Sequence, residues 1–204
     1  MKRIASLLAA ALSAVIATAA FAAPEVGKAA PDFTLTDING QSHSLSSFKG
    51  KTVVLEWVNP ECPFVVKHYE KSGNMPATQK AATADGVVWL SINSGAPGKQ
   101  GDFDKAKVEA WMQRVSAAPT AYFRDQDGKV GKLYDARTTP HMFVINPQGT
   151  LVYAGGIDDI RSADADDIKK ATNYVKAALA DLKAGKEVQT KTSRPYGCSV
   201  KYAD

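Results

Sequence analysis

The stretch Trp57-Val58-Asn59-Pro60-Glu61-Cys62-Pro63-Phe64 decides the fold of this chain. It overlaps the end of a nearly continuous apolar run, residues 52–58, which is typical of a buried parallel strand. A helix is expected to begin near Cys62 and to run toward His68, because Pro63 suits the first helical position, where a backbone N–H has no partner. The sequence therefore places a cysteine at the junction between a buried strand and a helix.

A cysteine at this junction is a candidate nucleophile. The free N–H groups and the positive dipole end of a helix stabilise a thiolate, which is the reactive form of cysteine. A buried structural cysteine is the alternative, but packing explains the two nearby prolines and Glu61 poorly. We therefore expect Cys62 to be the more reactive of the two cysteines. The side chains expected to shape its surroundings are those of Trp57, Asn59, Pro60 and Pro63.

Strand and helix patterns alternate along the rest of the chain. A small hairpin is expected within residues 31–45, and the further strand patterns lie at residues 87–92, 120–123, 142–145 and 151–154. The further helical patterns lie at residues 77–84, from 102 to the region before Pro119, at 129–134 and at 164–184. This order predicts an α/β fold with a mixed central β-sheet flanked by helices and an N-terminal hairpin extension.

The composition describes one globular domain. Of the 204 residues, 45% are apolar and 23% are charged, and the net charge is +4. A chain of this size buries enough surface to fold without a metal or a staple, and a charge so small and evenly spread does not predict a nucleic-acid partner. Two distant cysteines and three scattered histidines do not make a zinc framework, and no motif for binding a nucleotide cofactor is present. We therefore expect neither a metal nor a cofactor.

Residues 1–22 are predicted to be a secretory signal peptide. A basic start precedes an apolar run from Ile4 to Phe21, and cleavage is expected after Ala22. An uncleaved membrane anchor is the alternative, but the run is barely long enough to span a bilayer. The mature protein is therefore expected in the periplasm or outside the cell, without stable membrane association, where disulfides can persist.

Cys198 lies in a polar tail, residues 186–204, which follows a domain predicted to span residues 23–185. Two cysteines in an exported protein suggest a pair. Cys198 is expected either to react with oxidised Cys62 as a resolving thiol or to form a permanent bond that holds the tail, and the absence of any pairing is the third possibility. In a polar tail, its pKa is expected near the ordinary value for cysteine, about 8.5.

The strand, the cysteine at a helix start and the later segment Thr139-Pro140-His141-Met142-Phe143-Val144-Ile145 resemble the thioredoxin superfamily. The resemblance implies a thioredoxin-like fold in which a cis-proline, here Pro140 after Thr139, faces the active cysteine. More narrowly, residues 31–35, Cys62-Pro63 and residues 143–149 resemble the redoxin branch. This branch is the peroxiredoxin (alkyl hydroperoxide reductase/thiol-specific antioxidant) group and its thioredoxin-like relatives.

Three features depart from the parent families. Val65 stands where thioredoxins carry the second cysteine of C-x-x-C, and Asn59 and Leu55 stand where peroxiredoxins carry threonine and proline. Arg137 matches the peroxiredoxin active-site arginine best by position, and a solvated loop charge is the alternative. The chain thus resembles the peroxiredoxin-like group with a single N-terminal active-site cysteine.

Three functions are consistent with these residues. The first is peroxide reduction through Cys62, in which Cys198 or an external thiol resolves a sulfenic acid. The second is thiol–disulfide exchange with other exported proteins through a mixed disulfide at Cys62. The third is a non-enzymatic redoxin-fold binding protein with a structural disulfide. The resemblance favours the first, so we expect a peroxide or a disulfide as substrate and a thiol reductant protein as partner.

Overall fold

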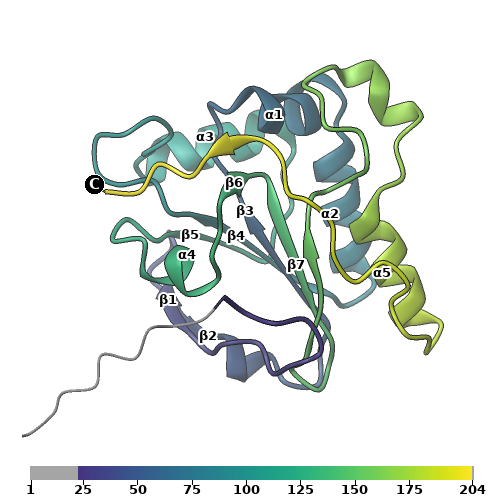
Figure 1. Ribbon diagram of the computed structural model, residues 1–204. Helices are drawn as coiled ribbons and strands as arrows, with labels where there is room; N and C mark the ends of the chain where they lie inside the picture. Colours follow the sequence, from purple (N-terminus) through teal and green to yellow (C-terminus); the bar gives the residue numbers. More distant parts are fainter. Residues whose placement is uncertain (1–22, 204) are drawn as a thin grey trace, which may run out of the picture.

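The centre of the molecule is a mixed five-stranded β-sheet with the strand order β5-β4-β3-β7-β8, seen in a computed structural model that describes residues 23–203 (Figure 1). The strands are β3 (Val53–Trp57), β4 (Val88–Asn93), β5 (Ala121–Arg124), β7 (His141–Ile145) and β8 (Leu151–Gly155). The first three are parallel, and β7 and β8 each run antiparallel to their neighbours. This arrangement confirms the predicted mixed sheet. The predicted signal peptide, residues 1–22, lies outside the described residues.

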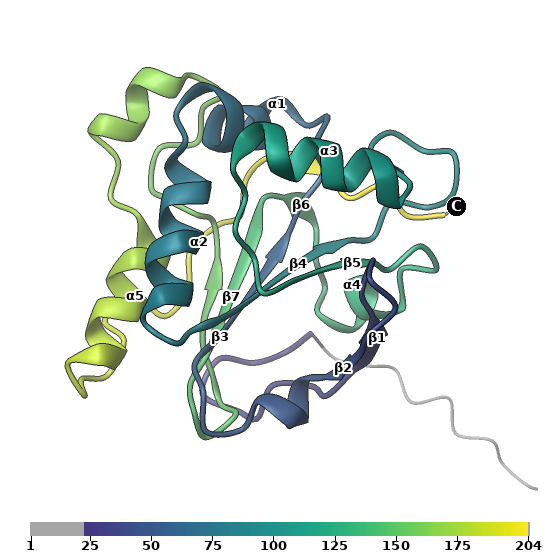
Figure 2. The same ribbon diagram turned by 180° about the vertical axis from the view of Figure 1, so that it is seen from behind.

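Most helices cover one face of the sheet, and a hairpin covers the other (Figures 1 and 2). The helices are α1 (Pro63–Val66), α2 (Asn74–Ala84), α3 (Lys105–Val115), α4 (Lys129–Leu133) and α5 (Tyr174–Lys183). All except α4 pack on one apolar cluster, the helical-face cluster, which includes Val54, Trp89 and Met142. α4 packs on the hairpin-face cluster, which includes Val53, Leu55 and Phe143. Because side chains alternate along each strand, neighbouring residues of β3 belong to different clusters.

The N-terminal hairpin closes the second face. It pairs β1 (Thr34–Thr36) with β2 (Ser42–Ser44), and a short 3-10 turn, η1 (Leu45–Phe48), follows directly. Phe33 and Leu45 are the buried side chains that the segment adds to the hairpin-face cluster. The hairpin predicted within residues 31–45 is therefore confirmed.

The last helix is shorter than the predicted range, residues 164–184. A 3-10 turn, η3 (Ala165–Lys169), buries none of its side chains and is separated from α5. The Asn173 side chain accepts the Lys176 N–H and so caps α5. The backbone at Asn173 also pairs with Asp158, which fixes the start of the helix. A long-range pairing thus divides a continuous sequence pattern.

The polar tail is an ordered segment of the fold. Its short strand β9 (Cys198–Ser199) pairs antiparallel with β6 (Thr138–Thr139). Further backbone hydrogen bonds bind the tail to the domain on both sides of β9: the N–H groups of Ala154, Ser193, Val200 and Ala96 donate to the carbonyls of Lys191, Ala154, Arg137 and Lys201, respectively. We call residues 191–202 the C-terminal strap. The strap, yellow in Figure 1, crosses the end of the molecule where α1 begins.

Candidate active site

Cys62 is the N-cap residue of α1, as the sequence predicts. Its backbone N–H donates to the Asn59 carbonyl at 3.0 Å, which closes a tight turn after β3. Its own carbonyl accepts the Val66 N–H at 2.8 Å, and Pro63 is the first helical residue. The turn and the helix together fix the backbone on both sides of the cysteine.

The turn before Cys62 is held by a second loop. The Asn59 amide donates to the Gln100 carbonyl at 3.2 Å, and the Glu61 carboxylate accepts the Gly101 N–H at 2.5 Å. Gly101 is required here, because it has a positive φ of 83° and a Cβ would collide with the Asn59 side chain. Asn59 and Glu61 therefore brace the turn that carries the cysteine.

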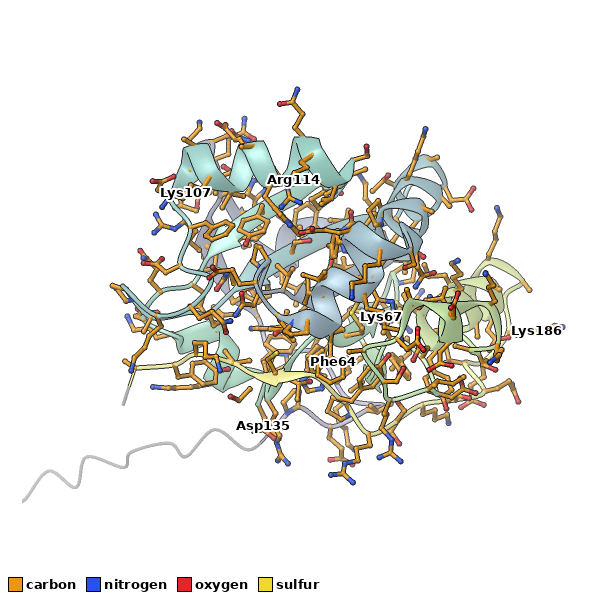
Figure 3. All side chains as sticks on the ribbon, turned by 90° about the horizontal axis from the view of Figure 1, so that it is seen from above. Phe64, Lys67, Lys107, Arg114, Asp135 and Lys186 are labelled. Carbon is orange, nitrogen blue, oxygen red and sulfur yellow. The ribbon has the colours of Figure 1, made fainter. Side chains whose placement is uncertain are left out.

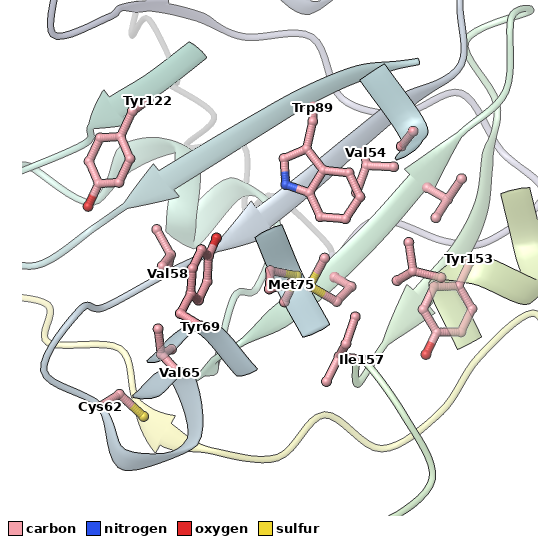
Figure 4. Packing of buried hydrophobic residues seen from close by; sticks show 14 of the residues in the cluster. Val54, Val58, Cys62, Val65, Tyr69, Met75, Trp89, Tyr122, Tyr153 and Ile157 are labelled. Carbon is pink, nitrogen blue, oxygen red and sulfur yellow. The ribbon is translucent and has the colours of Figure 1, made fainter. Parts of the chain in front are cut away.

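The Cys62 thiol points into the protein and meets the cis-proline loop. Its side chain is 0% exposed, and its Sγ–H donates to the Thr139 carbonyl at 3.1 Å. The Thr139–Pro140 peptide bond is cis, which confirms the prediction for this bond. Figure 4 shows Cys62 at the edge of the helical-face cluster, beside the yellow strand β9. The Cys62 sulfur therefore connects the start of α1 to the cis-proline loop.

Cys198 reaches the same place from the other end of the chain. In the antiparallel pairing of β6 and β9, Cys198 lies opposite Thr139, whose carbonyl binds Cys62. Both cysteines are free thiols, and the Cys62 thiol lies close enough to Cys198 to raise the pKa of Cys198. The strap therefore returns to the helix start, as any pairing of the two cysteines requires.

The surroundings of Cys198 oppose its ionisation. Burial and the nearby Cys62 thiol raise the pKa of Cys198 far above its usual range. The charge of Lys201 and the backbone of Phe64 lower this pKa, but their effect is weaker. The expectation of an ordinary pKa near 8.5 was wrong, because it treated the tail as solvated. Cys198 consequently keeps its proton while both thiols are reduced.

The other predicted site residues lie at different distances from this centre. Pro60 is buried in the turn, whereas Pro63 is exposed at the start of α1. Trp57 packs in the hairpin-face cluster and donates to Ser94, so its ring lies on the opposite side of the sheet from the cluster of Cys62. The Arg137 side chain is 71% exposed and forms an ion pair with Asp135. The site roles expected for these residues stay predictions.

A buried carboxylate lies in the strand that leads to Cys62. Glu56 accepts hydrogen bonds from Tyr69, Gln79, Trp89 and Ser91. Burial raises its pKa, and these four donors oppose that effect. The apolar pattern of residues 52–58 predicts a buried strand but does not predict this network. A single charged residue inside a buried run was the signal that could have found it, because such a charge needs partners.

A second polar network, also missed, joins the strap to the helix of Cys62. It consists of Lys67 and His68 in η2 (Lys67–Lys71), the π-helical turn that extends α1, together with Asp158 and Tyr196. Within residues 23–203, no group of three or more His, Cys, Asp or Glu side chains is placed to hold a metal ion. The same residues include no helix that is both long and apolar enough to cross a membrane.

A sequence model of the AhpC/TSA family matches residues 26–154, more than half of the chain. The chain belongs to the AhpC/TSA family. Within the thioredoxin superfamily it is similar to proteins named thiol-disulfide oxidoreductase ResA. The Geobacillus kaustophilus protein is 32% identical over 133 residues, which cover 62% of this chain and 66% of that protein. The Bacillus subtilis protein is 31% identical over 145 residues, which cover 70% and 75%.

Solved structures agree with this AhpC/TSA assignment at the level of the fold. A hypothetical protein from Sinorhizobium meliloti 1021 is 24% identical, with a TM-score of 0.74 over 89% of this chain and 97% of its own. An uncharacterized conserved protein from Geobacillus kaustophilus is 26% identical, with a TM-score of 0.73 over 88% and 93%. The family match ends before the C-terminal strap, so the place of Cys198 comes from the structure alone.

Proposed function

We propose that this AhpC/TSA-family chain is an exported thiol–disulfide oxidoreductase that cycles between a Cys62/Cys198 dithiol and a Cys62–Cys198 disulfide. The observation that carries the proposal is the pairing of Cys198 with Thr139, whose carbonyl binds the Cys62 thiol, although the two cysteines are 136 positions apart in the sequence. The thioredoxin-type second cysteine is absent at Val65, and Cys198 supplies a thiol from the strap in its place. The similarity to proteins named thiol-disulfide oxidoreductase supports the same chemistry.

The two thiols have different roles in this cycle. The Cys62 thiolate attacks one sulfur of a substrate disulfide, forms a mixed disulfide and releases the other sulfur as a thiolate. Cys198, which keeps its proton in the reduced protein, then loses it and attacks the Cys62 sulfur. The substrate leaves as a dithiol, and the protein is left as the Cys62–Cys198 disulfide. A thiol reductant protein restores the dithiol by the reverse exchange.

Peroxide reduction is the second candidate, and the AhpC/TSA match favours it. The Cys62 thiolate would attack one peroxide oxygen to give a sulfenic acid and hydroxide or an alkoxide. Cys198 would then condense with the sulfenic acid and release water. Against this candidate, Asn59 and Leu55 replace the peroxiredoxin threonine and proline, and the Arg137 side chain pairs with Asp135 at the surface.

One experiment separates these candidates. The reduced protein is mixed with one equivalent of glutathione disulfide or of hydrogen peroxide, and its mass is followed in time. We expect rapid loss of two hydrogen atoms with the disulfide, which glutathione disulfide accepts to become two molecules of glutathione, and a reaction with peroxide no faster than that of free cysteine. Cys198→Ser should stop at a glutathione adduct on Cys62, and Cys62→Ser should not react at a comparable rate.

The opposite preference would establish the peroxidase and reject the exchange reaction. In that case, Cys198→Ser should trap a sulfenic acid on Cys62, which a sulfenate-selective reagent detects. If the protein reacts with neither compound, and its disulfide resists mild reductant, then both enzymatic candidates fail. The remaining function is then a redoxin-fold binding protein with a structural disulfide.

A further inference from the structure

Tyr196 fixes the strap to the domain two residues before Cys198. Its side chain is buried, with 7% exposure for the whole residue, and its hydroxyl donates to Asp158 Oδ1 at 2.5 Å. The hydroxyl oxygen of Tyr196 also lies 3.2 Å from His68 Nε2. Burial lowers the pKa of His68 to about 3, so its ring is neutral and carries one proton. Because the Asn74 amide N–H donates to Nδ1, the ring proton is on Nε2. The Tyr196 hydroxyl therefore donates to Asp158 and accepts from His68.

The Tyr196 ring contacts the helical segment that begins at Cys62. It forms an edge-on contact with Phe64, with 5.8 Å between the ring centroids, and the Lys67 ammonium lies 5.8 Å from its centroid. Figure 3 labels both residues on the helix, with Phe64 next to the yellow strap. Phe64, Lys67 and His68 all lie within six residues of Cys62. Tyr196 thus connects the helix of one thiol to the strand of the other.

The helix can make these contacts because of its π-helical turn. η2 buries the consecutive side chains Lys67, His68 and Tyr69, and single π turns inside helices often occur at functional sites. Lys67 and His68 contact Tyr196, whereas Tyr69 donates to Glu56. The turn therefore presents two polar side chains to the strap and one to the core.

Asp158 makes this contact costly to break. Its carboxylate is buried, and burial raises its pKa, with Tyr196 as the main opposing hydrogen-bond donor and Lys67 as the nearby positive charge. Its Oδ1 also accepts the Ile160 N–H, but Oδ2 has no hydrogen-bond partner among the described residues. Because a buried carboxylate with few donors depends on each of them, loss of the Tyr196 hydroxyl weakens the attachment of the strap.

We propose that Tyr196 is a positioning residue that holds the C-terminal strap closed over Cys62 and presents Cys198 to it. This role rests on the dithiol cycle proposed above. Cys62 is 0% exposed, so an external disulfide reaches it only after the strap has moved. The closed strap is also the state in which Cys198 lies opposite Thr139, whose carbonyl binds the Cys62 thiol. Tyr196 therefore acts in opposite directions on two steps: it slows external attack at Cys62 and favours formation of the internal disulfide.

Tyr196→Phe tests both effects, because it removes the hydroxyl and keeps the ring. In a Cys198→Ser background, iodoacetamide should alkylate Cys62 on the order of tenfold faster, the effect expected from loss of a hydrogen bond to a charged group. With both cysteines present, the equilibrium constant for the internal disulfide against glutathione should fall on the order of tenfold. That constant measures the effective concentration of Cys198 at Cys62.

Two further variants make the test specific. Tyr134→Phe removes another buried tyrosine hydroxyl, which donates to the Pro31 carbonyl at 2.6 Å, and it should leave both measurements unchanged. Asp158→Asn keeps an acceptor for Tyr196 but removes the charge, so it should shift both measurements in the same directions by a smaller factor. It also replaces Tyr196→Phe as the test if that variant does not fold.

Three results would overturn the proposal. The first is an unchanged alkylation rate and an unchanged equilibrium constant in Tyr196→Phe. The second is a fall in both the alkylation rate and the equilibrium constant. The third is an equal response of Tyr134→Phe and Tyr196→Phe. Failure of the dithiol cycle looks different, because the wild-type chain would then form no disulfide with glutathione. The alkylation measurement needs no disulfide chemistry, so it decides in that case whether Tyr196 holds the strap closed.

Discussion

Gly197 lies directly against the carbonyl group of Thr139, so closely that a Cβ at position 197 would collide with its oxygen and carbon atoms. This contact brings the strap onto the cis-proline loop one residue before Cys198. Only glycine permits so close an approach, and Gly197 also has a φ of 142°, which other residues rarely adopt. The contact between the two cysteines thus depends on a residue that has no side chain.

Gly197→Ala should therefore lift the strap from the loop. We expect faster alkylation of Cys62 in a Cys198→Ser background, and slower closure of the internal disulfide when both cysteines are present. Gly185→Ala is the matched control, because Gly185 also has a positive φ, 68°, but has open space where its Cβ would lie. Equal effects of the two substitutions would show that backbone strain, and not the collision with Thr139, is responsible.

The ionisation of Cys198 should depend on Cys62. Because the neighbouring Cys62 thiol is one of the causes that raise the pKa of Cys198, its removal should lower that pKa. In Cys62→Ser, the alkylation midpoint of Cys198 should accordingly move to lower pH than in the wild-type chain, as followed by mass spectrometry of the peptide that carries it. An unchanged midpoint would mean that burial alone sets the pKa, and the two thiols would then not be in contact in solution.

The strand-to-helix junction at Cys62 and the cis bond before Pro140 could be predicted because their signals are local. An apolar run followed by a proline at the first helical position specifies the junction within a dozen residues. The segment 139–145 carries the family pattern of the cis-proline loop on its own. These two features position the first thiol and the carbonyl that binds it.

The path of the strap could not be predicted, because contacts distant in sequence determine it. Residues 186–204 have no hydrophobic periodicity, and Tyr196 gains its role only from Asp158 and His68, which lie far from it in the sequence. The same limit explains the helix expected over residues 164–184, which the pairing of Asp158 with Asn173 interrupts. Hydrophobic patterns in a sequence indicate which face of an element is buried. They do not indicate which polar side chains, distant in the sequence, form hydrogen bonds with one another.

Replacement of Glu56 should destabilise the domain, because its carboxyl group is buried and accepts four hydrogen bonds. Glu56→Ala leaves the buried donors of Tyr69, Trp89, Gln79 and Ser91 without their acceptor, so the free energy of unfolding should fall by about 3 kcal/mol. Glu56→Gln should cost less, because its carbonyl oxygen still accepts. Urea denaturation of the three proteins measures both values. A smaller loss for alanine than for glutamine would contradict the importance of these hydrogen bonds.

His141 should make the domain less stable in acid. Burial lowers its pKa to about 4, from the 6.5 of an ordinary histidine. As the pH falls below 6.5, the unfolded chain binds a proton that the folded protein refuses until about pH 4, so the free energy of unfolding falls across this range. Between pH 7 and pH 5, the contribution of His141 to this fall is about 2 kcal/mol.

His141→Asn tests this contribution, because its side-chain oxygen can still accept the Arg137 N–H. Urea denaturation should show that the free energy of unfolding of this variant falls less between pH 7 and pH 5, by that amount. Glu56, His68 and Asp158 are common to both proteins and cancel in the comparison, so an equal loss in the two proteins would mean that His141 is protonated at pH 5 in the folded state.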